Sequence, residues 1–432
     1  MSETAPAVRA SVLARVLRDF RGIAADLPGD EFAHAARARA AARLTELGWP
    51  STRDEHWRYA NLRAFERLGS FGPSPAAALP APLALPPAVP GFERLTFIDG
   101  RRVGAAHPLL VASAPPLATA PSWPAEQRLG LLGDMFASDT ARLHIRGAAA
   151  IEILFISNPA STASYPRLEL RLEPDSQLQL IERHLALAPT SAASAPASPA
   201  LSLTACNVTV ELGRGATLTH YRLQQCHRDC VFSDSVAARL EQQSRYAVRS
   251  IAIGGGSART SASVQLAGRG AALAWAGIAV GRGEQVHDIA LTVQHAAPDT
   301  RTEELFRGIA DERARVAFSG HIQIDATAPA SQARQSLRGL IESNGEIDLR
   351  PRLEILTDDV RAAHGATTGR LDEDVLFYLL ARGIDRPTAR ALLKWAFLGD
   401  VLREIEVPAL RAEAERLAAG QLPDVPPLGA LP

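Results

Sequence analysis

Apolar and polar residues follow two different periods along the chain. Between about Leu143 and Ile355 they alternate in short runs separated by Gly, Asp or Asn, which is typical of half-buried β-strands. Before Leu68 and after Asp372, apolar residues recur every three or four positions, as on one face of an α-helix. The pattern predicts a mainly β core between an N-terminal and a C-terminal helical part. The predicted strands lie at residues 151–156, 168–172, 178–181, 208–212, 218–223, 247–253, 264–266, 289–293, 322–324 and 353–355.

Glycine-rich turns punctuate the predicted core. The tripeptide Gly-Arg-Gly begins at Gly213, Gly268 and Gly281, each time just before a run of small and apolar residues. Repeated units of turn and strand with almost no helix indicate a sandwich, a propeller or a solenoid. No exact period emerges, so the pattern alone leaves these three architectures open.

The N-terminal part is predicted to hold three helical segments before Leu68. Two apolar stripes mark helical faces, and Gly48 ends the second helix. The third segment is rich in aromatic residues, including Trp57 and Tyr59. We interpret both as packing residues and not as ligands, because aromatic side chains bury large apolar areas.

The C-terminal part is predicted to begin two helices at Asp372 and Asp385, whose side chains suit N-cap positions. Gly383 suits the left-handed position that ends the first of these helices. A stripe at four-residue spacing follows, formed by Leu393, Phe397, Val401 and Ile405. Core packing is the commoner role for such a stripe, and docking of a partner protein is the alternative.

Charge and composition exclude several classes of protein. The chain has 432 residues with 46 basic and 47 acidic side chains, so a broad electrostatic footprint for nucleic acid or anionic lipid is not expected. The N-terminal stretch has arginines within its apolar rhythm, which fits neither a signal peptide nor a membrane span. We therefore expect a cytoplasmic protein that binds neither nucleic acid nor membrane, and three cysteines fit a reducing compartment.

Candidate metal ligands are few. Cys226 and Cys230 lie close to His220 and His227 in the sequence, but a structural zinc site usually has two tight ligand pairs and only one is present. Cys226 and Cys230 are therefore weak candidates, and we expect no resident metal. No pair of acid and base residues can be assigned, so we expect no catalysis.

The segment 351–405 carries a family resemblance. It contains LEI, two aspartates, HGAT, LDE, FYL and RGI in this order, and it closely resembles the C-terminal signature of the SufB/SufD family of iron–sulfur cluster assembly proteins. The sequence EHWRYANLRAF at 55–65 is similar to an N-terminal element of the same family. The resemblance implies a right-handed parallel β-helix between helical ends, a heterodimer with SufB through the ends of the two β-helices, and docking of the ATPase SufC on the C-terminal helices.

His364 is the candidate ligand that the resemblance singles out. Family members similar to this chain have a histidine in HGAT that is proposed to help hold a transient iron–sulfur cluster at the interface with SufB. Many also have a cysteine two residues earlier, where this chain has Ala362. The thiolates of any cluster at this site must then come from SufB. The resemblance also admits a flavin and, for the chain alone, a homodimer, although no stretch reads as a flavin site.

The predicted organisation leaves three hypotheses for function. The first is a non-catalytic scaffold subunit of a SUF complex, the second is a SufB-like paralogue, and the third is a carbohydrate-active β-helix enzyme. The absence of cysteine after Cys230 argues against the second, and the absence of a secretion signal argues against the third. The predicted parts are an N-terminal helical domain (1–68), a Pro- and Ala-rich linker (69–91), a mixed connecting segment with a hairpin (92–142), the β-helix (143–358, with a disordered insert at 189–200), a C-terminal helical domain (359–420) and a tail (421–432).

Overall fold

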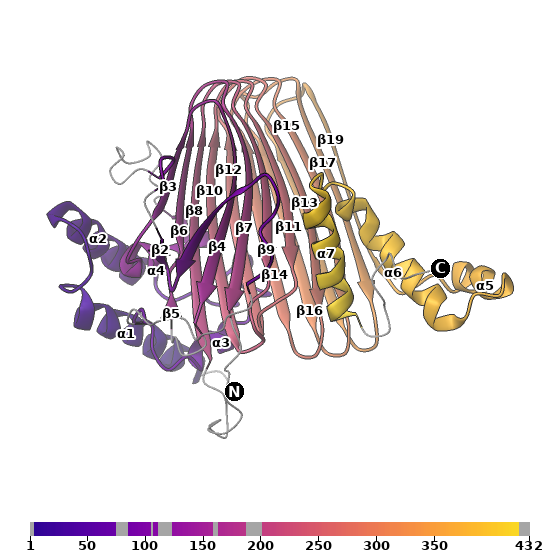
Figure 1. Ribbon diagram of the computed structural model, residues 1–432, viewed down its shortest axis with the longest axis horizontal. Coiled ribbons are helices and arrows are strands. Elements are labelled where there is room, and N and C mark those ends of the chain that lie inside the picture. The colour runs from indigo at the N-terminus through magenta and orange to yellow at the C-terminus, as the bar shows by residue number, and fades with distance from the viewer. Residues whose placement is uncertain are drawn as a thin grey trace.

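Two facing β-sheets with helices on their outer faces form the structure, a computed structural model (Figure 1). It describes residues 4–74, 85–104, 107–110, 123–158, 163–186 and 201–422, with side chains from Val12 onward. The predicted insert at 189–200 and most of the predicted tail lie outside the described residues, as do residues 75–84 of the predicted linker.

The first sheet has ten strands and the second has nine. In order across the first sheet, the strands are β2 (Arg101–Val103), β1 (Glu93–Ile98), β4 (Ala148–Ser157), β7 (Gln177–Ala186), β9 (Thr217–Gln224), β11 (Arg245–Ala252), β13 (Ala272–Gly281), β15 (Arg301–Ala310), β17 (Ser331–Ile341) and β19 (Val360–Gly369). Across the second sheet they are β3 (Ala141–Ile145), β6 (Arg167–Leu172), β8 (Ser202–Leu212), β10 (Cys230–Leu240), β12 (Ser257–Leu266), β14 (Val286–His295), β16 (Arg315–Ile324) and β18 (Glu346–Ile355), while β5 (Ala163–Ser164) pairs with β8.

The chain crosses from one sheet to the other after almost every strand, and each strand pairs in parallel with the strand one turn later. This topology is a parallel β-solenoid, so the mainly β fold with helices at both ends is confirmed. Successive turns differ in length. Val231 pairs with Ser257, 26 residues later, and Arg315 pairs with Glu346, 31 residues later. This variation explains why no exact period emerges from the sequence.

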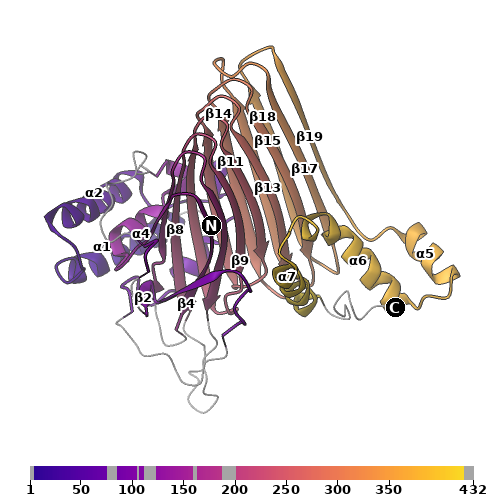
Figure 2. The ribbon, with the colours of Figure 1, turned by 45° about the horizontal axis from the view of Figure 1, so that its top comes forward.

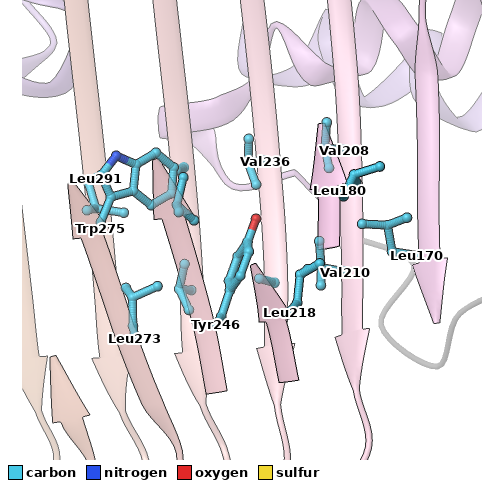
Figure 3. Packing of buried hydrophobic residues seen from close by; sticks show 14 of the residues in the cluster. Leu170, Leu180, Val208, Val210, Leu218, Val236, Tyr246, Leu273, Trp275 and Leu291 are labelled. Carbon is cyan, nitrogen blue, oxygen red and sulfur yellow. The ribbon is translucent and has the colours of Figure 1, made fainter. Parts of the chain in front are cut away.

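Alternation of side chains builds the interior of the solenoid. Leu218, Tyr246 and Leu273 are register partners on successive strands of the first sheet, and they face Val210 and Val236 of the second (Figure 3). All five are buried. Burial of one such side chain contributes about 1.5–3 kcal/mol, so the stacked rows between the sheets supply the main stabilisation of the core.

The Gly-Arg-Gly tripeptides form turns between strands, as predicted. Gly215, Gly270 and Gly283 have φ angles of 69°, 72° and 71°, in the left-handed region that favours glycine. The predicted hairpin is also confirmed, because β1 and β2 pair in antiparallel fashion around Asp99 and Gly100, which both have positive φ.

Four N-terminal helices cover the outer face of the second sheet. They are α1 (Thr4–Ile23), α2 (Glu31–Leu47), α3 (Leu62–Glu66) and α4 (Gly130–Phe136). Their apolar side chains share a cluster with Leu203 and Val231 of β8 and β10. Trp57 is buried with the Arg259 guanidinium 3.9 Å from the centre of its ring, which confirms its packing role.

Two of the three C-terminal helices cover the outer face of the first sheet. These helices are α6 (Arg386–Leu402) and α7 (Pro408–Gln421), and α5 (Glu373–Ala381) projects away from the sheet (Figure 1). The caps agree with the predictions, since the Asp372 and Asp385 side chains accept backbone N–H bonds and Gly383 has a φ of 84°. Ion pairs fix α6 to the sheet, including Arg307 with Asp400 at 2.7 Å.

The strands continue beyond the predicted boundary at residue 358. The segment Val360–Gly369, assigned from sequence to the helical domain, forms β19. Its run of Ala, Gly and Thr lacks the large β-branched and aromatic residues that mark strands, and for this reason the pattern missed it. Among the described residues, no helix is both long and apolar enough to cross a membrane.

Candidate functional site

The C-terminal end of the solenoid exposes two unpaired strand edges. β18 and β19 are each ten residues long, and each pairs with a neighbour on one side only. No residue of either strand is fully buried, and most of β19 is exposed. A long, exposed edge presents unpaired N–H and C=O groups and is a template for pairing with another chain. We call this surface, formed by β18 and β19, the open edge.

His364 lies in the middle of β19, although the predicted boundaries placed it in the C-terminal helical domain. The partly buried side chains of Val360 and Ala362 pack against the core, and alternation along a strand places His364 on the same, inward side. The imidazole is nevertheless exposed, because no further rung covers it. The site therefore combines an exposed imidazole with an unpaired backbone edge.

Behind His364, a row of polar side chains runs into the solenoid. His364 is the register partner of Gln335 on β17, and Gln335 is the partner of Glu304 on β15. The Gln335 amide donates hydrogen bonds to Glu304 Oε2 at 2.9 Å and to the Gly320 carbonyl at 3.0 Å. Burial raises the pKa of Glu304 to about 8, so this carboxyl is largely protonated at neutral pH.

The amide orientation of Gln335 is consequently fixed. Both of its N–H groups have acceptors, and its Oε1 is buried without a hydrogen-bond partner among the described residues. That oxygen belongs to the side chain in register with His364. A carbonyl oxygen beside an imidazole can accept the N–H of one ring nitrogen and leave the other nitrogen free to coordinate iron.

An apolar helix follows the open edge. α5 begins four residues after β19 ends, and Figure 2 shows it beyond α6, away from both sheets. Val375, Phe377 and Tyr378 on this helix are exposed, Phe377 by 71%. Large apolar side chains gathered on one exposed helix mark an interaction surface.

The stripe predicted for packing or docking, Leu393 to Ile405, does not lie on α5 but on the side of the C-terminal helices that faces the first sheet. Val401 and Ile405 are buried in the cluster between the C-terminal helices and the first sheet, and Leu393 and Phe397 are partly buried against it. The two fully buried side chains are covered by this chain itself and are not available for contact with another protein. Periodicity located the apolar face correctly but could not tell which surface covers it.

The weak metal-ligand candidates Cys226 and Cys230 lie together, but neither His220 nor His227 joins them. Cys226 and Cys230 are buried and hydrogen-bond each other, and His227 contacts Asp229 at 3.2 Å. His220 lies in the solenoid interior, where its Nδ1 is 3.1 Å from the Tyr246 hydroxyl. Within the described part of the chain, these four side chains form no common site.

Sequence reasoning missed a group of buried polar side chains between the sheets. We call it the interior polar cluster, and its members are Glu182, His184, Cys206, His220, Arg222 and Asp234, all buried. A signal was present, because Glu182 and His184 continue the inward face of Leu178 and Leu180 in the run QLQLIERH. An apolar face that turns polar within one strand indicates buried polar groups with a specific role.

Arg222 organises this cluster. Its guanidinium donates to Glu182 Oε1 at 2.8 Å and to Asp234 Oδ2 at 2.8 Å. His184 Nε2 lies 2.5 Å from Glu182 Oε1, and His220 Nε2 lies 2.8 Å from Glu182 Oε2. Burial disfavours the Glu182 carboxylate, but Arg222 and the two histidines outweigh burial and hold its pKa well below the ordinary value. Burial also lowers the pKa of His220.

Comparison with known proteins agrees with the fold. Residues 155–397 match the family model of the SUF system FeS cluster assembly, SufBD core domain. An iron–sulfur cluster assembly SufBD family protein of Synechocystis is 28% identical over 87% of this chain and 88% of its own length. The iron–sulfur cluster assembly protein SufD of Escherichia coli is 24% identical over 88% of this chain and 91% of its own, and SufD of Bacillus subtilis is 32% identical over 32% of this chain and 31% of its own. The match to the family model covers more than half of the chain, which therefore belongs to the SufBD family of SUF iron–sulfur cluster assembly proteins.

Proposed function

We propose that this chain is a SufD-type, non-catalytic scaffold subunit that works in the cytoplasm as part of a SUF complex. Its open edge pairs with the corresponding edge of SufB. The observation that carries the proposal is the open edge itself, where two ten-residue strands each lack a neighbour on one side. Pairing with a second solenoid would satisfy the unpaired backbone groups and remove a surface prone to aggregation.

In this proposal His364 is the ligand that the chain contributes to a cluster assembled at the junction with SufB. Its imidazole is exposed at the open edge, so a partner solenoid seated on β19 would bring its own side chains against it. Ala362 has no donor atom, so the thiolates come from SufB. The fixed Gln335 oxygen would hold one ring N–H and direct the second nitrogen to iron.

SufC docks on the C-terminal helices in the same proposal, and α5 is the element best suited to contact it. Val375, Phe377 and Tyr378 are exposed there, whereas α6 is held to the first sheet by its apolar face and by ion pairs. Removal of the whole segment from Asp372 would also uncover the outer face of the first sheet. Substitution of Phe377 and Tyr378 by Ser is therefore the cleaner test of SufC binding.

The decisive experiment is co-expression of the His364→Ala variant with SufB and SufC. Complex formation should survive, because an exposed imidazole contributes little to packing. Cluster accumulation on the purified complex, measured by visible absorbance during anaerobic reconstitution, should fall. Thr367→Ala on the opposite, exposed face of β19 is the matched control and should leave both measurements unchanged.

The outcomes separate the two parts of the proposal. An intact His364→Ala complex that accumulates clusters at the wild-type level would exclude His364 as a ligand. A weakened complex with a proportionate loss of clusters would make His364 a structural residue. If the unaltered chain fails to co-purify with SufB at fixed stoichiometry, the scaffold proposal itself is wrong.

A further inference from the structure

Three metal-ligand side chains of the interior polar cluster lie close together far from the open edge. The donor atoms of Glu182, His184 and Cys206 are all within 4.8 Å of one another. Glu182 is fully buried, and His184 and Cys206 are 2% and 1% exposed. Among the residues that the structure describes, no other group of His, Cys, Asp and Glu converges in this way.

The fold explains why these three residues meet. Glu182 and His184 are two positions apart on β7, so both point inward from the first sheet. Cys206 points inward from β8 in the second sheet, in the same row as Val208 and Val210. The site is therefore built on two rigid, facing strands.

The charges of the cluster do not balance without a further cation. Arg222 is hydrogen-bonded to two carboxylates, Glu182 and Asp234, all three buried within the solenoid. Two carboxylates and one guanidinium leave one negative charge in the interior, and an uncompensated buried charge is costly. A divalent cation bound together with the Cys206 thiolate would add one net positive charge and neutralise the cluster.

The donor types select the class of ion. One thiolate, one imidazole and one carboxylate suit a divalent ion of borderline softness such as Zn²⁺ or Fe²⁺, and not Mg²⁺ or Ca²⁺. His184 Nδ1 is buried without a hydrogen-bond partner among the described residues, so this ring has a free polar atom in the interior. A cavity of about 30 Å³ borders His184, Arg222 and Asp234 and is large enough to hold one water beside the cluster.

We propose that Glu182, His184 and Cys206 bind one divalent transition-metal ion in the interior of the solenoid, separate from any cluster at His364. Binding replaces the thiol proton of Cys206, which is released to water, by the metal ion. The ion also replaces the contact between His184 and Glu182, while Arg222 and His220 hold the Glu182 carboxylate from its other side. The ion joins β7 to β8 across the solenoid, so its role is structural.

The test uses the full-length protein and Co²⁺, whose absorption reports a bound thiolate. Because the site is buried, metal content is first measured on the protein as purified, by elemental analysis, and the protein is then refolded with Co²⁺ alone. We expect close to one equivalent of metal per chain and a thiolate-to-cobalt charge-transfer band. Cys206→Ser should abolish this band and weaken retention of the ion by at least about tenfold.

Matched controls exist in the same chain. Cys226→Ser and Cys230→Ser remove the other two buried thiols and should keep both the metal and the band. Absence of metal in the purified protein together with absence of the band after refolding would overturn the proposal. A band that survives Cys206→Ser, or that is lost in Cys226→Ser, would equally overturn it. If Cys206→Ser does not fold, the proposal is decided by the metal content of Glu182→Gln and by the presence of the thiolate-to-cobalt band in the wild-type protein.

Discussion

The two ends of the solenoid are closed in very different ways. At the N-terminal end, the last strand of the first sheet is β2, which has only three residues and belongs to a tight hairpin with β1. The last strand of the second sheet, β3, is bridged by Leu110, which packs with Leu109 against the core. At the C-terminal end, β18 and β19 each remain unpaired along one edge over their ten residues.

The difference shows which terminal rung of the solenoid is protected within this chain and which is not. A solenoid must end somewhere, and short edges or covering segments are the usual way to protect its last rung. Among the residues that the structure describes, both devices are present at one end and neither is present at the other. The unprotected end carries His364 and is followed by the exposed apolar helix α5. We therefore interpret the open edge as the surface that a partner completes.

The largest effect that would test this contrast comes from truncating apolar side chains at different distances from the open edge. Leu291 is 1% exposed between β12 and β16, and Leu291→Ala should cost about 2–5 kcal/mol in free energy of unfolding. Leu353 on the terminal strand β18 is only partly buried, and Leu353→Ala should cost roughly 1 kcal/mol in the isolated chain. Urea denaturation of both variants measures the difference.

The same pair of variants sharpens the comparison in the complex. If a partner covers the open edge, the cost of Leu353→Ala should rise when denaturation is repeated with SufB bound, whereas the cost of Leu291→Ala should not. Equal costs for the two variants in the isolated chain would mean that the last rung is already packed and that the open edge is closed by other means.

The next prediction concerns backbone pairing. The Gln332 N–H donates to the Thr300 carbonyl, and Gln332 is the register partner of Arg361. The backbone N–H and C=O groups of odd-numbered residues of β19 therefore point to β17, and those of even-numbered residues point to the unpaired edge. Ala366→Pro removes an outward N–H and should leave the chain folded. Pairing with SufB should weaken about 100-fold or more, a loss of roughly 3 kcal/mol, measured by titration calorimetry.

Ala363→Pro is the matched control for this prediction. It removes an N–H that faces β17, so it should lower the melting temperature of the isolated chain as well as disturb pairing. Unchanged affinity of Ala366→Pro for SufB would show that the partner does not extend the sheet at β19.

The smallest expected effect is the pH dependence of stability that Glu304 causes, and it reports whether water enters the interior near the open edge. The pKa of Glu304 is raised to about 8 by burial, so the folded protein retains this proton while the unfolded chain loses it near pH 4.5. Stability from this group is full below pH 4.5 and should fall by about 1.4 kcal/mol for each pH unit as the pH rises towards 8. Glu304→Gln should abolish this fall, as measured by denaturation at pH 6 and pH 7.

A different result would be equally informative. If wild type and Glu304→Gln show the same dependence on pH between 6 and 7, Glu304 is already ionised and the interior near the open edge is hydrated. Gln335→Leu would then be expected to change little, since water would replace the amide as partner of Glu304.

Much of the fold was predictable because it depends on local patterns. Helix caps at Asp372 and Asp385 and the hairpin at Asp99 follow from short-range chemistry, and all three are present. The strands β3, β10, β13, β15, β17 and β19 were not predicted. β13 and β19 were missed because their sequences are rich in Ala and Gly, which alternate little in polarity. The choice of a solenoid over a sandwich or propeller came from the family resemblance, since pairing between strands almost thirty residues apart leaves no local signal.

The candidate site was predictable only in part. The motif singled out His364, whose role as a ligand stays a prediction, but the place of this residue inside a strand, in register with Gln335 and Glu304, is a property of long-range pairing. The grouping of Cys206 with Glu182 and His184 likewise depends on which strands face each other across the interior. Closeness in sequence does bring Cys226 and Cys230 together, but it cannot indicate a group of ligands that comes from opposite sheets.

The one-sided pairing of the terminal rung also affects how the molecule opens over time. In a solenoid each rung is held only by its neighbours, so local opening is easiest where one neighbour is missing. Amide hydrogen exchange should be fastest in β19, slower in β17 and slowest in β13, because rungs open in order from the terminal one. A partner bound to the open edge would then suppress the opening of the terminal rung, and it would slow amide exchange several rungs away from the surface that it contacts.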